Sequence, residues 1–280
     1  METEPIIYRW HFDPLIMLLM VLIVYGYYRI SHFSHRRANG CFWTAMSLFF
    51  MTECSPLHFL GMHYYFSIHM LGHIIILLVC GPLFVMSIPQ RPTLFLQKRL
   101  QQICGFFYRH SWVAWLAGVG IMWFWHIPVI FDGTFNSSHS LSWLPLAHAG
   151  SILLGGILFS LPLFGPFADR QVHPLTGVLY LFTACVSCSL LGLLITFAPI
   201  GIYHHYMDLS LHAQMPGNPW GITVLQDQQA AGLIMWVPCC FIYLGGCIYL
   251  LIRWFGGSGH KYDKDWVKVD ELIIDHDRRR

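Results

Sequence analysis

The chain has 280 residues, of which 56% are hydrophobic and only 11% carry a charge. Its mean hydropathy of +0.54 lies outside the range of soluble domains and excludes a water-soluble enzyme or binding module. The formal net charge of +2 gives no indication of a nucleic-acid partner. The composition predicts an integral membrane protein in contact with a lipid bilayer.

Seven stretches are long and apolar enough to span a bilayer as helices, which takes about 20 mostly apolar residues. They cover residues 12–30, 41–60, 67–88, 111–131, 142–165, 174–200 and 228–252. We therefore predict an all-α fold with seven transmembrane helices in one domain, 1–255, and a loosely ordered cytoplasmic tail, 256–280. The connection 89–110 is expected to include a short interfacial helix. No basic region or cleavage site precedes the first stretch, so it is expected to be an anchor.

The distribution of Lys and Arg predicts the orientation of these helices. Fifteen of the sixteen cations lie on one side of the seven stretches, and only Arg9 lies on the other. Because cytoplasmic loops are enriched in Lys and Arg, the N-terminus is expected outside and the C-terminus in the cytoplasm. Termini on opposite sides require an odd number of spans, which agrees with seven.

Four histidines lie near the outer ends of three predicted helices. His69 and His73 are four residues apart and share one helix face, separated by about 6 Å along the axis. His126 lies in the sequence WFWHIP (123–128), where the proline is expected to kink the helix and open a cavity. His148 follows near the start of the next helix. Ionisable groups are costly in a bilayer, so we predict a shared metal site rather than four separate imidazoles bonded to backbone or water.

Two acidic residues are expected at a similar depth, and each has more than one interpretation. Glu53 lies near the outer end of the second helix, where a carboxylate is protonated, paired with an imidazole, or facing a metal or water-filled pocket. Asp227 begins the last helix, where Asp is a favoured N-cap. It can also accept a hydrogen bond from a ligating imidazole.

The cysteines carry less information. Of the nine, Cys185 and Cys188 form a CxxC pair in the middle of the sixth helix, whereas redox CxxC motifs normally lie at an exposed helix start. We interpret them as small core residues. The alternative is a path of soft ligands for monovalent copper that adds Cys239 and Met235. The inner halves of the helices lack other ionisable groups, which favours binding or delivery at the outer face over transport across the membrane.

Four elements of the sequence resemble the CtaG family of cytochrome c oxidase assembly factors, which is associated with caa-type oxidases. They occur in the family's order, on the predicted helices, from about residue 10 to 255. HMLGH at 69–73 with GPL at 81–83 is similar to the family's HMxxH…PL signature, and WHIP at 125–128 with Asp132 is similar to its WHxP element. His139 and His148 are similar to the paired histidines that open the family's next helix. Asp227-Gln228 with Gly232 and Trp236 is similar to its DQxxxG-and-Trp element.

The resemblance implies a seven-helix protein of the bacterial inner membrane that helps copper reach a cytochrome c oxidase. It implies an assembly factor rather than an enzyme, with the oxidase subunits and a periplasmic copper donor as partners. Copper is the expected metal, in an oxidation state that the sequence leaves open. The expected ligands are His69, His73, His126 and His148, and the expected supporting residues are Glu53, Asp227, Gln228, Met70, Asp132 and His139. Glu53 is not part of the family pattern.

Three other functions are compatible with the residues. Histidines on facing helices can hold a haem b group. A metal with an open coordination position, with Glu53 as general base, would make a membrane metalloenzyme. The soft-ligand path would make a copper transporter. Metal and haem analysis of the purified protein distinguishes the first of these from copper binding.

The charge asymmetry makes a prediction about topology. A reporter fused after Arg280 should be cytoplasmic, and one inserted in the 201–225 connection should be periplasmic. Fifteen of the sixteen cations lie on the same side of the predicted helices as the C-terminus, and that side is expected to be cytoplasmic. Alkaline phosphatase and green fluorescent protein fusions measure this directly. Both reporters on the same side would contradict the seven-helix model, because the segment 228–252 would then not cross the membrane.

Overall fold

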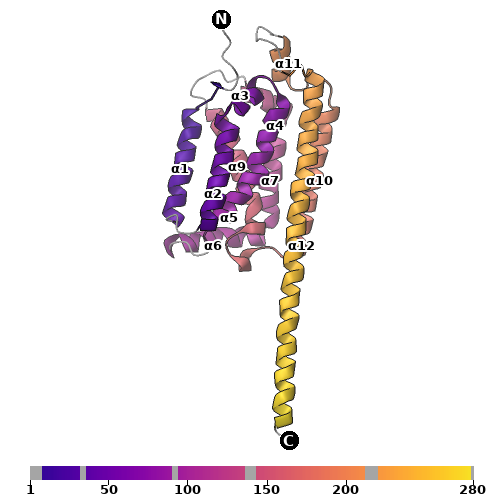
Figure 1. The fold of residues 1–280 in the computed structure, drawn as a ribbon. Helices are drawn as coiled ribbons and strands as arrows, with labels where there is room; N and C mark the ends of the chain where they lie inside the picture. The colour runs from indigo at the N-terminus through magenta and orange to yellow at the C-terminus, as the bar shows by residue number, and fades with distance from the viewer. Residues whose placement is uncertain (1–7, 32–35, 90–93, 136–142, 212–219, 279–280) are drawn as a thin grey trace.

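The computed structural model describes residues 8–31, 36–89, 94–135, 143–211 and 220–278. These residues form helices and connections without a β-strand, which confirms the predicted all-α class (Figure 1). The elements in chain order are α1 (Pro14–Ser31), α2 (Arg36–Cys54), α3 (Pro56–His63), α4 (Phe66–Ile74), the π-helix η2 (Ile75–Cys80), α5 (Gly81–Ser87), α6 (Leu94–Arg109), α7 (Ser111–Trp125), α8 (Pro128–Phe135), α9 (Trp143–Phe164), the 3-10 turn η3 (Ala168–Arg170), α10 (Pro174–Phe197), α11 (His204–Leu211) and α12 (Val224–Arg278).

Five of the described helices are long and apolar enough to cross a membrane, so the protein is a multi-pass membrane protein. They are α1, the continuous stretch Phe66–Ser87, α9, α10 and the Val224–Gly256 part of α12. The pair α7 and α8 makes a sixth if the two helices, bent by 74° at the break, form one span. The remaining predicted segment falls on α2 and α3. Since α2 begins with Arg36 and Arg37 and ends near Glu53, it is less apolar, and seven spans stay a prediction.

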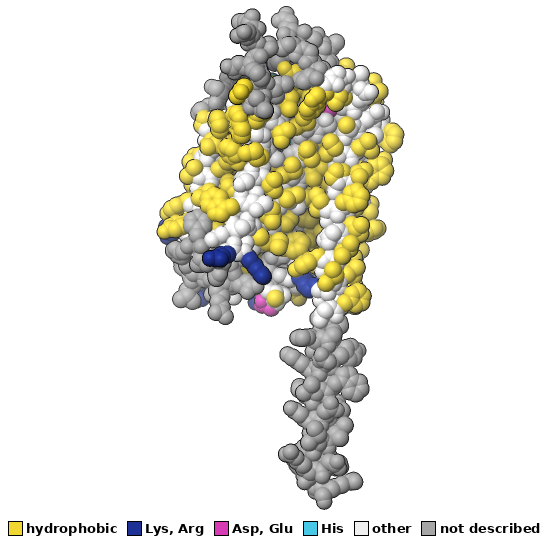
Figure 2. Space-filling model, viewed as in Figure 1, with side chains coloured by type: hydrophobic (Ala, Val, Ile, Leu, Met, Phe, Trp, Pro, Cys, Tyr) yellow, Lys and Arg dark blue, Asp and Glu magenta, His cyan; other side chains and the backbone are white. Residues whose placement is uncertain are grey.

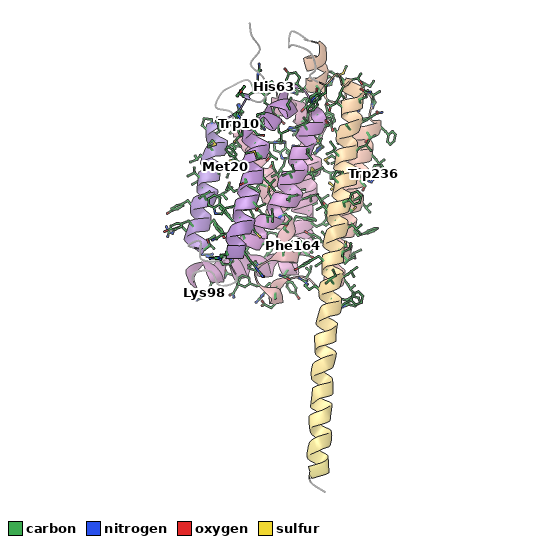
Figure 3. All side chains as sticks on the ribbon, in the orientation of Figure 1. Trp10, Met20, His63, Lys98, Phe164 and Trp236 are labelled. Atoms are coloured by element: carbon green, nitrogen blue, oxygen red, sulfur yellow. The ribbon has the colours of Figure 1, made fainter. Side chains whose placement is uncertain are left out.

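The outer surface of the described bundle is suited to lipid. Large apolar side chains are exposed along the helices, among them Leu22 on α1, Phe182 on α10 and Phe241 on α12. Figure 2 shows hydrophobic side chains over the visible face and Lys and Arg gathered near the end from which α12 continues. His63 and Lys98 lie at opposite ends of the bundle (Figure 3). We call these ends the α3 end and the α6 end.

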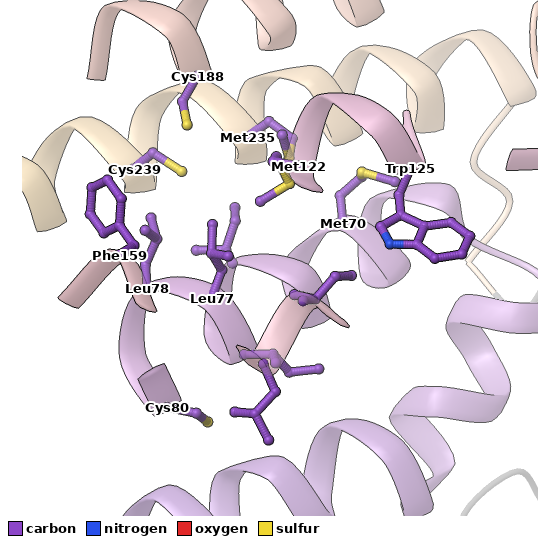
Figure 4. Packing of buried hydrophobic residues seen from close by; sticks show 14 of the residues in the cluster. Met70, Leu77, Leu78, Cys80, Met122, Trp125, Phe159, Cys188, Met235 and Cys239 are labelled. Carbon is purple, nitrogen blue, oxygen red and sulfur yellow. The ribbon is translucent and has the colours of Figure 1, made fainter. Parts of the chain in front are cut away.

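The continuous stretch α4–η2–α5 lies at the centre of the bundle. Its first helix packs on α12, and its last helix packs on α9 and α2. The surrounding core is rich in sulfur: Met70, Met122, Met235, Cys188 and Cys239 are buried in one cluster (Figure 4). Two of the four predicted ligands therefore belong to the stretch that packs against α2, α3, α9 and α12.

A π-helical segment follows the histidines of α4. Pro82 has no N–H to donate one turn back, and the N–H of Gly81 bonds to the carbonyl of Ile76, five residues earlier. Gly81 also approaches the backbone of α9 closely, because a Cβ built on it would lie 2.4 Å from the carbonyl carbon of Gly156. Because Gly81 and Gly156 have no side chains, α9 can lie directly against the central stretch.

Two further predictions can be compared with the structure. The expected kink at Pro128 is confirmed by the 74° bend between α7 and α8. The expected interfacial segment contains α6, which lies across one end of the bundle (Figure 1). The tail, in contrast, was expected to be loosely ordered. The structure instead continues α12 as one helix to Arg278, beyond the bundle, since no proline interrupts 256–278.

The glycine contact between the central stretch and α9 can be tested by adding one methyl group. A Cβ on Gly156 would lie 2.4 Å from the carbonyl oxygen of Leu77, so Gly156→Ala should force the helices apart. Overpacking of this kind costs about 1–3 kcal/mol. Unfolding of the purified protein in detergent should show that loss. Gly245→Ala is the matched control, because no atom lies within 4 Å of its added Cβ. Equal stability of both variants would contradict the close contact.

Candidate metal centre

Three of the four predicted histidines converge. His69 and His73 project from α4, and His148 projects from α9. One ligand nitrogen from each lies within 4.8 Å of the other two. The rings of His69 and His148 are stacked, with centroids 5.5 Å apart, and the ring of His73 lies edge-on to that of His69 at 4.5 Å. We call these three residues the histidine triad.

The geometry of the triad fits a metal ion. Nε2 of His73 lies 3.0 Å from Nε2 of His148. Two imidazole nitrogens that each bind one metal at about 2.0–2.1 Å lie roughly 3 Å apart when their bonds are near 90°. Nδ1 of His73 is buried and has no hydrogen-bond partner among the described residues. An unsatisfied buried polar atom is costly. Neither nitrogen of the His73 ring is hydrogen-bonded to the described backbone, so the ring is free to bind a metal ion.

His126 lies beside the triad but is turned toward a methionine. Its ring centroid is 5.3 Å from that of His73. Its Nδ1 lies 2.5 Å from the carbonyl of Met122, and a carbonyl can only accept, so the hydrogen is on Nδ1. The unprotonated Nε2 then faces the thioether of Met70 at 2.9 Å. Both atoms are electron-pair donors, and together they form a nitrogen and sulfur pair suited to a soft metal.

A cavity of about 140 Å³ connects the triad with the surface of the α3 end. Its lining includes all three triad histidines and the two residues His58 and Glu53. The exposed His11, which precedes α1, also lines it. The triad is therefore buried in the bundle and still borders a space that reaches exposed residues.

Contacts with α7 hold His148 in place. Nε1 of Trp125 donates to the hydroxyl of Ser151 at 2.8 Å, and that hydroxyl donates to the carbonyl of His148 at 3.0 Å. The ring of Trp125 also lies edge-on to the imidazole of His148, with centroids 4.9 Å apart. The Trp125-His126 sequence thus contributes one residue that supports the triad and one that pairs with Met70.

Asp227 supports α4 rather than its own helix. Its buried carboxylate accepts hydrogen bonds from the backbone N–H of Phe66 at 2.6 Å, the N–H of Ser67 at 3.1 Å and the hydroxyl of Ser67 at 2.5 Å. A negative charge at the start of a helix satisfies its unpaired N–H groups and favours the helix dipole. We expected Asp227 to cap α12 or to bond to an imidazole. It instead caps the helix that carries His69 and His73.

The other supporting residues predicted from the sequence also join helix ends. The amide of Gln228 donates to the carbonyls of Ile195 and Ala198 at the end of α10. The carboxylate of Asp132 accepts from the N–H groups of His204 and His205 at the start of α11. His139 lies outside the described residues.

The CxxC cysteines contact α12, and no cysteine of the chain forms a disulfide. All nine are free thiols. Sγ of Cys185 lies 3.4 Å from Sγ of Cys240, and Sγ of Cys188 lies 3.5 Å from the hydroxyl of Tyr243. These contacts pack α10 against α12, as expected for small core residues.

Sequence reasoning did not connect two histidines with this site. His58 lies on α3, with Nδ1 4.0 Å from a carboxylate oxygen of Glu53, and its ring stacks on that of His11 at 5.7 Å. The helix break at Ser55 and Pro56 returns the chain toward Glu53. The sequence predicted one continuous helix over 41–60, so it gave no signal that residues after Ser55 form a separate helix.

The sequence matches the family model described as cytochrome c oxidase caa3 assembly factor (Caa3_CtaG) over residues 21–256. This is most of the chain, so the protein belongs to that family, as the resemblance of its motifs indicated. An assembly factor associates with its oxidase, and the family description indicates a role in assembly rather than catalysis. No curated protein and no solved structure matches the chain significantly.

The contact between Asp227 and α4 makes a prediction about stability. Asp227→Ala removes the acceptor for the first N–H groups of α4, and loss of a helix N-cap costs about 0.5–2 kcal/mol. The free energy of unfolding in detergent should fall by that amount. Asp227→Asn retains one acceptor oxygen and should lose less. An alanine variant as stable as the original protein would show that the cap does not hold α4.

Proposed function

We propose that the histidine triad binds copper and that the protein supplies this copper to a cytochrome c oxidase during its assembly. The observation that carries the proposal is the convergence of three imidazoles, with two nitrogens 3.0 Å apart. They border a cavity whose lining also includes exposed residues. Family membership supports the oxidase as the recipient.

The donor atoms favour copper over other common metals. Imidazole binds copper in both oxidation states, whereas magnesium and calcium require oxygen ligands. Met70 and His126 add a thioether and a nitrogen beside the triad, and a thioether favours the monovalent ion. We therefore infer that His126 and Met70 belong to the same centre. The triad holds copper first and this pair provides softer donors next to it.

The residues around the triad perform different tasks. The carboxylate of Asp227 fixes the start of α4, and the Trp125–Ser151 contact fixes His148, so the imidazoles are held before copper arrives. The apolar core on the side of Met122 and Met235 keeps water and polar ligands away. Copper would therefore enter and leave through the cavity rather than across the bundle.

This arrangement weighs against the other functions. A haem needs a flat slot between its axial ligands, whereas His73 and His148 are in direct contact and the cavity is about 140 Å³. Pockets for drug-sized ligands measure about 300–1,000 Å³. Glu53 lines the cavity, but an enzyme would also need room for a substrate beside the metal. Transport through the cysteines lacks a polar path.

The proposal includes a place and a set of partners. The expected orientation puts the α3 end, with the triad, on the periplasmic face of a bacterial inner membrane. A periplasmic copper donor would load the protein there, and the oxidase would receive the metal on the same side. The contact with the oxidase is then expected at the α3 end.

Replacing one triad histidine tests the proposal. His73→Ala removes the buried imidazole that contacts both other rings, so copper affinity should fall by at least about tenfold. Metal content after equilibration with copper measures this. The variant should remain in the membrane, because insertion depends on apolar length, while assembled oxidase in cells should decrease and partly recover with added copper.

The matched control replaces the CxxC cysteines. Cys185→Ala with Cys188→Ala should retain copper binding and oxidase assembly, because their thiols contact residues of α12 rather than the triad. If the cysteine variant lost function and His73→Ala did not, the triad would be the wrong site and copper transport through the soft ligands would become the better explanation.

A further inference from the structure

The mouth of the cavity contains a second set of metal-binding side chains. Glu53, His58 and His11 line the same space as the triad. They come from three different segments: the end of α2, the helix α3 and the residues before α1. They line one cavity only through tertiary packing. Their donor atoms are not all as close together as those of the triad, so side-chain rotation would have to bring them onto one ion.

Among the described residues, no hydrogen bond accounts for the burial of Glu53. Its side chain is only 11% exposed, and its carboxylate lies 4.0 Å from Nδ1 of His58, too long for a hydrogen bond. Other acids near the α3 end accept hydrogen bonds from helix starts. Asp13, which also lines the cavity, accepts from the first N–H groups of α1. Asp227 accepts from those of α4 and Asp132 from those of α11. A buried carboxylate that caps no helix and faces a cavity is suited to a ligand.

We propose that Glu53, His58 and His11 form a receiving site for divalent copper at the mouth of the cavity, through which the ion passes to the triad. The inference rests on the proposed function, since it makes the triad the destination. Two imidazoles and one carboxylate form a nitrogen and oxygen donor set that suits the tetragonal coordination of divalent copper, with water completing the shell. The softer Met70 and His126 lie deeper.

The two sites differ in ways that suit transfer in one direction. His11 is exposed, His58 is partly exposed at 21%, and His73 is 2% exposed. The first site includes one carboxylate, whereas the second offers three imidazoles.

The test counts copper ions on the full-length protein in detergent or lipid nanodiscs. The protein is equilibrated with copper(II) sulfate and freed of unbound metal, and the bound copper is measured by mass spectrometry and electron paramagnetic resonance. The unaltered protein should hold two ions per chain. Glu53→Gln with His58→Ala should hold one, and the signal of the nitrogen and oxygen site should disappear. His73→Ala should retain that signal and lose the other ion.

His63→Ala is the matched control. His63 lies on α3 like His58, but its Nδ1 bonds to the carbonyl of Phe59 and its ring stacks on Phe59, and it does not line the cavity. Burial lowers the pKa of His63, so a neutral imidazole is present there too. This variant should bind copper as the unaltered protein does.

The results separate the receiving site from the proposed function. One ion per chain in the unaltered protein, or an unchanged count and signal in Glu53→Gln with His58→Ala, overturns the receiving site and leaves the triad intact. Loss of the His63→Ala signal would show adventitious binding by α3 and also overturn it. Full copper content in His73→Ala overturns the triad instead. Glu53→Gln alone, nearly unchanged in shape, gives a second measurement if the double variant folds poorly.

Discussion

The carboxylate of Asp227 joins the start of α12 to the start of α4, and the histidine triad depends on that contact. It satisfies two backbone N–H groups and the hydroxyl of Ser67 in a region without solvent. His69 and His73 follow within two turns of the capped end. A charge that is costly to bury is therefore used to fix the depth and rotation of the central helix, and the triad is held before any metal binds.

A second constraint comes from close backbone contact on the opposite side of α4–η2–α5. Gly156 and Gly81 bring α9 against the central stretch, and α9 carries His148. The π-helical turn lies between the histidines and this contact. A π-helix has more residues per turn than an α-helix, so it changes the side of the stretch on which later residues lie. The histidines of α4 can therefore face His148 while Gly81 of α5 faces Gly156. The imidazole contact between α4 and α9 thus follows from packing several turns away.

Donor types are arranged by depth at the α3 end. Carboxylate and exposed imidazole lie at the mouth of the cavity, imidazole alone lies inside it, and thioether lies beside the buried core. His11 is exposed, whereas His73 and Met70 are buried. The same order runs from ligands of divalent copper to ligands of monovalent copper.

The sequence by itself determined the helices, the bend at Pro128, the shared face of His69 and His73, and the family, because apolar length, proline geometry and the i, i+4 spacing are local properties. Only the tertiary structure decided that His148 completes the triad while His126 turns to Met70, and that Asp227 caps α4 rather than α12. It also decided that His58 and His11 line one cavity with Glu53. These outcomes depend on the rotation and relative height of packed helices. Apolar lipid-facing segments have nearly uniform patterns, so a single sequence leaves both undetermined.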